Sequence, residues 1–269
     1  MRTTLPAPTI VLMCAFFLVG GSVTAARAQQ SKDTKTPTFW QRDPDADFED
    51  EGKMHCAPTA VSDGLIYLSK EFGLSDLVPG TGHKAQIKLI EELADEFGTD
   101  PSIGGTNPDK ILTGLRSYVK GKGYELDRLE LVSWRGVSTN NKKYKTGTKP
   151  EMSWMLEAAR RKDTVVIFNF GWYRESDDGG YIRNGGHWVA VVGADTNSGF
   201  IVHNPILQPE KQLSQKALTL SLIKNDFLVE KDSDEANMRG YYKGNGPGLP
   251  HGDSVTAVLD SVIVFSIKQ

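Results

Sequence analysis

Cys56 is the first residue of the chain whose type and position could carry out chemistry. It lies in Met54-His55-Cys56-Ala57-Pro58, directly before apolar residues spaced as one face of a helix. The unpaired N–H groups and the positive dipole end at a helix start favour a thiolate over a thiol, and the same groups could hold an oxyanion. Cys56 is therefore a predicted nucleophile. The alternative is a small, buried apolar residue.

A candidate base and its orienting partner follow later in the chain. His187 begins a predicted strand directly after Gly185 and Gly186, which permit close backbone approach beside an imidazole. Asn204 ends the next predicted strand, and a short turn at 195–198 would place the two strands antiparallel. An amide oxygen that accepts from the ring would fix its tautomer, so His187 is the predicted base and Asn204 its orienter. The alternatives are a structural histidine and a strand-ending turn.

The order of these residues is typical of a known class of enzymes. From Cys56 to His187 is 187 − 56 = 131 residues, within the papain-type separation of ~130–150. Residues 54–60 resemble the Cys-Gly/Ala-Pro-Thr/Ala segment of the bacteriocin-processing peptidases, family thirty-nine of the cysteine peptidases, and of their exported relatives. Gly186-His187-Trp188-Val189 resembles their Gly-His-Trp/Tyr-Val strand, and Asn204-Pro205 falls where they carry Asp-Pro or Asn-Pro. The resemblance implies catalytic roles for Cys56, His187 and Asn204 on a papain-like fold.

Two features depart from that family. Its members usually carry a glutamine shortly before the cysteine, which donates to the oxyanion, whereas the nearest upstream glutamine here is Gln41, 56 − 41 = 15 residues away. Loss of one such donor typically lowers the rate by roughly 10²–10³. Leader-processing members also act in the cytoplasm, fused to transporter segments, which this chain lacks. Leader cleavage is therefore not the predicted task.

The elements that must position these residues follow from periodicity. Helices are predicted to begin at Cys56 and at Asn107-Pro108, and strands dominate the later part of the chain. Further predicted helices cover 85–97 and 150–159, predicted strands cover 124–131, 164–170, 187–194, 199–204 and 255–267, and loops are predicted at 175–185 and 230–250. This order predicts an α+β domain over 54–269, with a helical N-terminal half packed on a mostly antiparallel sheet.

The N-terminus predicts export. Arg2, the apolar run from Ile10 to Val19 and the small residues up to Ala28 predict a signal peptide over 1–28 and a periplasmic or extracellular protein. A lipoprotein site at Cys14 fits less well, because the apolar run continues past it. Removal of the signal leaves 269 − 28 = 241 residues, enough for one domain. No later segment reaches the ~20 apolar residues of a membrane span.

Residues 29–53 form a polar, acidic segment before the predicted domain. Its like charges favour a solvated arm, which Phe39, Trp40 and Phe48 could hold against the body. The whole chain has a net charge of −3, which argues against nucleic acid and anionic membranes as partners. A peptide or protein substrate is the predicted partner.

Other groups of residues in the sequence fit a functional site less well. His55, Cys56 and His203 lack the paired spacings of a zinc site, and the glycines from 244 to 252 lack the lysine and helix of a phosphate cradle. His83 and His251 are predicted loop residues. No metal and no cofactor are predicted.

The sequence therefore predicts an exported cysteine peptidase that cleaves peptide or related amide bonds through Cys56, His187 and Asn204. Hydrolysis and acyl transfer stay open. The alternative is a non-catalytic module that binds peptides or an envelope partner at the same site, which the missing glutamine favours.

Overall fold

The computed structural model describes residues 32–136, 144–177, 179–194, 199–214, 217–231, 234–250 and 254–268. The predicted signal peptide at 1–28, the predicted turn at 195–198 and His251 lie outside the described residues. In the segments given above, no helix has both the length and the apolar character needed to cross a bilayer.

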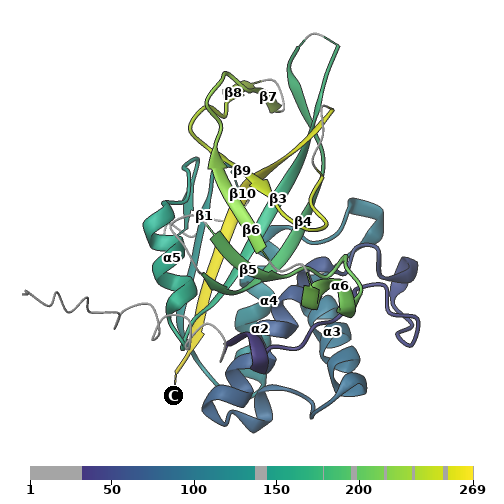
Figure 1. Ribbon diagram of the computed structural model, residues 1–269. Helices are drawn as coiled ribbons and strands as arrows, with labels where there is room; N and C mark the ends of the chain where they lie inside the picture. Colours follow the sequence, from purple (N-terminus) through teal and green to yellow (C-terminus); the bar gives the residue numbers. More distant parts are fainter. Residues whose placement is uncertain are drawn as a thin grey trace, which may run out of the picture.

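Three helices from the first half of the chain pack side by side on one side of the molecule (Figure 1). They are α2 (Cys56–Phe72), α3 (His83–Phe97) and α4 (Pro108–Gly121). α2 ends at Gly73, whose φ of 68° suits a residue without Cβ, and Pro108 opens α4 where its missing N–H costs nothing. These helices confirm the predicted ones, except that His83, a predicted loop residue, is the first residue of α3. The other helical segments are α5 (Met152–Arg160), α6 (Pro209–Ser214), η1 (Glu49–Gly52), η2 (Ser75–Leu77) and η3 (Pro101–Ile103).

The strands close into a barrel. Six of them pair in an antiparallel cycle, β10-β9-β6-β5-β4-β3 and back to β10, while β1, β2, β7 and β8 extend it. Their bounds are β1 (Leu126–Ser133), β2 (Lys145–Thr146), β3 (Val165–Glu175), β4 (Tyr181–Ala194), β5 (Gly199–His203), β6 (Ala217–Leu222), β7 (Leu228–Lys231), β8 (Asp234–Asn237), β9 (Tyr242–Asn245) and β10 (Val255–Ile267).

The predicted fold class is wrong. The α+β, papain-like arrangement, a helical N-terminal half packed on a mostly antiparallel sheet, gives way to a closed six-stranded antiparallel barrel with additional strands and few helices. The error has a local cause. β9 lies in the predicted loop at 230–250, whose glycines disguise a strand, and β6 was not predicted at all. These two strands join β5 to β10 and so close the barrel.

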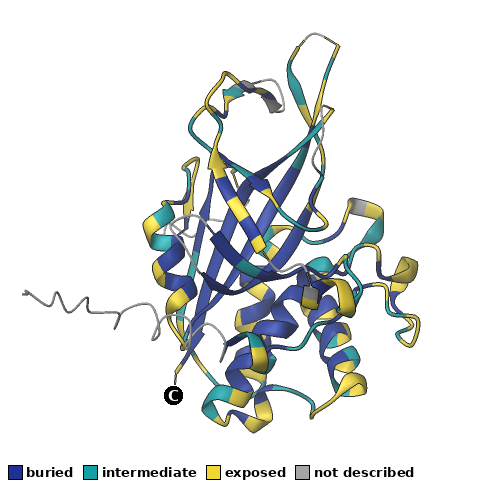
Figure 2. Cartoon of the chain, viewed as in Figure 1, coloured by how far each residue is buried: buried dark blue, intermediate teal, exposed yellow. Residues whose placement is uncertain are grey.

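Alternation along β3 and β4 divides the core into two clusters. Ile167 and Ala190 face α2, α3 and α4 on one side of the strands. Phe168 and Val191 face the opposite side, with β5, β6, β10 and α5. Strands β3 and β10 are buried along most of their length, while exposed residues gather on the outer faces of the helices and at the hairpin tips (Figure 2). Strand β4 therefore contributes residues to both clusters.

The segment before α2 lies against the body more closely than the acidic composition suggested. Phe39 and Phe48 are buried, and Lys32 Nζ donates to three backbone carbonyls, of which Thr164 O is the nearest at 2.8 Å. Burial lowers the pKa of Lys32 to about 8. Gln212 Nε2 donates to Phe39 O at 2.8 Å. The aromatic residues and these hydrogen bonds outweigh the repulsion of the exposed acids.

Candidate active site

Cys56 is the first residue of α2, as predicted, and a tight turn leads into it. Asp50, Glu51 and Gly52 all have positive φ, and a Cβ on Gly52 would lie 1.8 Å from Gln41 O, so only glycine fits there. Cys56 is partly exposed as a residue, but its thiol is buried and accepts from the backbone N–H of Trp188. Cys56 is thus placed beside the residue that follows His187.

The thiol does not have the lowered pKa that a helix start predicts. Burial raises the pKa of Cys56 to about 11, although the N–H groups of Trp188, Ala57 and Cys56 itself oppose the shift. The predicted thiolate is wrong for this resting site because desolvation of the sulfur exceeds the stabilisation by backbone dipoles. At neutral pH the Cys56 side chain is therefore a thiol.

His187 is buried on β4, where it pairs with Phe170 of β3. Its Nε2 lies 2.5 Å from Asn204 Oδ1. The indole of Trp172 flanks the imidazole, with ring centroids 6.2 Å apart. Burial lowers the pKa of His187 to about 4, and the hydrogen bond to Asn204 only partly offsets this. The ring is therefore neutral at pH 7 and can accept a proton.

The contacts of Asn204 determine which nitrogen of His187 carries the proton. The carbonyl of Pro247 can only accept, so Nδ2 of Asn204 faces it, at 2.7 Å. The N–H of Ile206 can only donate, so Oδ1 accepts it, at 3.2 Å. Because Oδ1 is also the atom that faces His187, Nε2 of the imidazole must donate and Nδ1 keeps its lone pair. The neighbouring backbone thus selects the tautomer that a base needs.

Gln41 lies closer to the site than its distance in sequence suggests. Its side-chain Nε2 donates to Gly52 O and Lys53 O, at 3.0 and 2.8 Å, and its backbone N–H donates to Pro205 O at 2.8 Å. Residues 42–51 loop out between these contacts. Both amide hydrogens are occupied, so Gln41 supports the turn before Cys56 and has no side-chain donor left for an oxyanion.

His203 and His55, the other histidines considered for the site, make contacts that serve the structure elsewhere. His203 Nδ1 lies 2.8 Å from Pro37 O and its Nε2 lies 3.0 Å from Asp33 Oδ1, so it cannot exchange roles with His187. His55 stacks on Phe48 with ring centroids 4.7 Å apart. The contacts of these residues therefore give no support to a zinc site formed by His55, Cys56 and His203.

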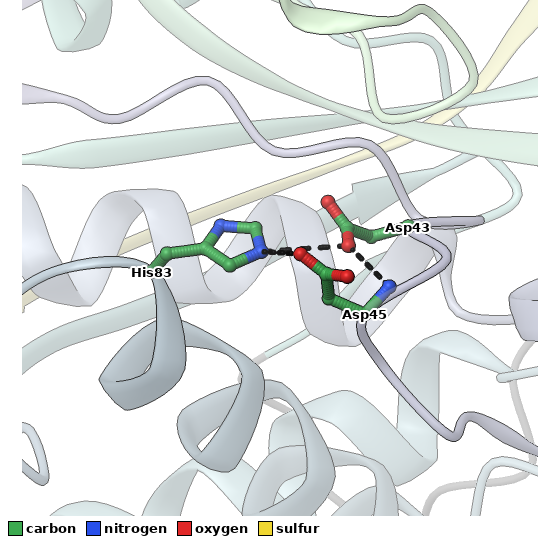
Figure 3. Close-up of side chains that lie close together, drawn as sticks. All are labelled: Asp43, Asp45 and His83. Carbon is green, nitrogen blue, oxygen red and sulfur yellow. Dashed lines mark hydrogen bonds and ion pairs between the residues drawn. The ribbon is translucent and has the colours of Figure 1, made fainter.

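One group of side chains could hold a cation. Asp43, Asp45 and His83 point toward one another in the described structure, with their ligand atoms within 4.8 Å (Figure 3). His83 Nε2 lies 3.4 Å from Asp43 and 4.0 Å from Asp45, and about half of its side chain is exposed. Direct contact between the His83 ring and the two carboxylates explains the same geometry without an ion, so these residues are not assigned to a metal.

Sequence reasoning missed a second group near His187. Asp260 on β10 is buried and accepts from the Tyr173 hydroxyl at 2.7 Å and from Trp134 Nε1 at 2.9 Å. Arg183 on β4 completes the group, with Nε 2.8 Å from Asp260 Oδ2. An acid inside the apolar run 255–267 was the available signal, because buried carboxylates are almost always paired.

The sequence matches no protein-family model, and no curated protein matches it either. The assignment of function therefore depends on the residues and geometry described above.

Proposed function

We propose that the protein is a thiol hydrolase that cleaves peptide or related amide bonds, with Cys56 as nucleophile, His187 as base and Asn204 as its orienter. The observation that carries the proposal is the hydrogen bond of 2.5 Å between His187 and Asn204, whose amide is oriented by Pro247 and Ile206. An amide held in this way leaves Nδ1 of the imidazole as the proton acceptor.

The protonation states define the proposed chemistry. Cys56 rests as a thiol and His187 as a neutral imidazole, because burial raises the first pKa and lowers the second. Attack then requires transfer of the thiol proton to Nδ1 as the sulfur bonds to the carbonyl carbon. The N–H groups of Cys56 and Ala57 at the start of α2 would hold the oxyanion, since Pro58 has none.

The proton taken up by His187 is then passed on in the later steps of the reaction. The imidazolium gives it to the leaving amine as the C–N bond breaks, which leaves an acyl group on the Cys56 sulfur. Water attacks this thioester with His187 again as base, and the free thiol returns. Asn204 accepts from Nε2 throughout and keeps the ring in one orientation.

A peptide library tests the proposal. Wild type and Cys56→Ala are incubated with a mixed peptide library at pH 7, and new termini are identified by mass spectrometry. We expect cleavage by wild type alone, with acylation of the Cys56 sulfur detectable by intact mass after rapid acid quench. Equal turnover by both proteins would contradict the assignment of Cys56 as the nucleophile.

A non-catalytic binding module is the second candidate. The observation that favours it is the raised pKa of the Cys56 thiol together with the lowered pKa of His187, since this pair forms no ion pair at rest. A module of this kind would retain peptides in pull-downs with Cys56→Ala and with wild type alike, and would release no new termini.

Export is part of the proposal. The signal-like residues 1–28 support a periplasmic or extracellular enzyme. Removal of that segment would leave Cys56 as the sole cysteine of the chain, without an intramolecular disulfide partner. Its burial would then also slow oxidation of the sulfur, because oxidation follows thiolate character and exposure.

A further inference from the structure

Arg183 is held rigidly by a buried carboxylate. The side chain of Asp260 is 2% exposed, and it accepts from Arg183 Nε at 2.8 Å as well as from Tyr173 and Trp134. A carboxylate fixed by three donors holds the guanidinium in one place with little loss of entropy on binding a ligand. The Arg183 side chain itself keeps 25% exposure.

The terminal nitrogens of Arg183 lie beside Gly186, on the same strand as the residue whose backbone contacts the candidate nucleophile. A Cβ on Gly186 would lie 2.2 Å from Nη2 of Arg183, so the guanidinium covers the face of this exposed glycine. Gly186 and Trp188 lie on the same face of β4, roughly 7 Å apart along the strand. The N–H of Trp188 is the group that contacts the Cys56 thiol. The guanidinium of Arg183 thus lies about two residues along β4 from the backbone group that contacts Cys56.

The guanidinium of Arg183 has N–H donors that are not used in the pairing with Asp260. Within the part of the chain that the structure describes, Arg183 donates only through Nε. Its two terminal nitrogens carry four further N–H groups in a planar fork that matches a carboxylate. If Arg183 served only as the counter-ion of Asp260, its terminal N–H groups would have no role beside Gly186.

We propose that Arg183 recognises a carboxylate of the substrate, held close to the scissile bond on the Gly186 side of Cys56. The inference rests on the proposed hydrolase function. The carboxylate comes from either an acidic side chain or the C-terminus of the peptide, and the two share the same recognition chemistry.

The test compares matched peptides. One set carries Glu or Gln at each position within two residues of the scissile bond, with an amidated C-terminus, and a second set ends there as a free acid or an amide. We expect wild type to show kcat/KM about 10- to 100-fold higher for the carboxylate member of at least one pair. The set that shows the preference identifies the source of the carboxylate. Equal values in both sets would overturn the proposal.

Variants separate recognition from folding. Arg183→Gln alone leaves Asp260 buried without its counter-ion, so it is paired with Asp260→Asn in a double variant that carries neither charge. The double variant should lose the preference, while the control Arg174→Gln, at an exposed arginine of β3, keeps it. A double variant that folds and retains the preference would overturn the proposal.

Binding to Cys56→Ala distinguishes this inference from the proposed function. The same peptide pairs are titrated by calorimetry against that variant, with and without the Arg183 and Asp260 changes. If wild type cleaves nothing, the hydrolase proposal fails, and tighter binding of the carboxylate peptides that depends on Arg183 still supports recognition. Binding that ignores the carboxylate, or no binding, overturns it.

Discussion

Two buried histidines on neighbouring strands differ in what their nitrogens face. His187 on β4 directs Nε2 to the amide of Asn204, and that contact leaves Nδ1 as an acceptor. His203 on β5 has oxygen acceptors at both nitrogens, the carbonyl of Pro37 and the carboxylate of Asp33. The first ring is arranged to take a proton, whereas the second holds the N-terminal segment to the barrel. The residue type alone does not separate these roles; the partners do.

The largest expected effect on activity comes from loss of the proposed base, His187. His187→Ala should lower kcat/KM by about 10²–10⁴-fold, because positioned acid–base groups typically contribute that much. His203→Gln should leave activity of the same order, since His203 contacts Pro37 and Asp33 instead of the nucleophile. Steady-state kinetics on one cleaved peptide measures both. A larger loss in the His203 variant would reverse the assignment of roles.

The pH dependence of stability should sharpen the comparison. The pKa of His187 is lowered from 6.5 to about 4 in the folded protein, so protonation favours unfolding. Its contribution is complete above pH 6.5 and is lost as the pH falls toward 4, by up to roughly 3 kcal/mol. Urea unfolding at several pH values measures this change. His187→Gln should flatten the curve in that window, and an unchanged curve would contradict the lowered pKa.

Removal of the orienting amide should have a smaller effect. Asn204→Ala leaves the His187 N–H and the Pro247 carbonyl without their partner, and a lost buried partner typically changes free energy by ~1–3 kcal/mol. We therefore expect kcat/KM to fall roughly 5- to 150-fold, mainly through kcat. Activity at the wild-type level would show that the amide does not orient the ring.

The smallest effect concerns His203. Asp33→Asn keeps an oxygen acceptor and removes its charge, so stability should fall by about 1 kcal/mol, the difference between charged and neutral hydrogen bonds. Thermal unfolding measures it, and kcat should stay unchanged. A fall in kcat with no change in stability would mean that the N-terminal segment acts on the site directly.

Local signals in the sequence predict individual helices and strands better than they predict the closure of the barrel. Helical spacing after Cys56 and alternation after His187 depend on residues close in the chain. The helix forms as predicted, but β4 begins at Tyr181, inside the predicted loop at 175–185, so His187 lies within the strand and does not begin it. Closure depends on the pairing of β6 and β9, and the four residues of β9, Tyr242–Asn245, are too few to show a strand period in a glycine-rich surrounding. Pairing across such distances is decided by tertiary packing, which overrides weak local propensity.

The candidate site divides in the same way. Residue types and order pointed to Cys56, His187 and Asn204, but not to the contacts that set their protonation. The fixing of Asn204 by Pro247 and the pairing of Arg183 with Asp260 join segments 43 and 77 residues apart. The raised pKa of Cys56 also opposed the helix-start argument, because burial of a sulfur can be seen only in the folded chain.

The protonation of His187 at pH 7 tests the central claim most directly. Nitrogen-15 NMR of wild type labelled at histidine, assigned with His187→Gln, reports the state of each ring nitrogen. The account predicts a neutral ring with the proton on Nε2 and a lone pair on Nδ1. A proton on Nδ1, or an imidazolium at pH 7, would contradict it.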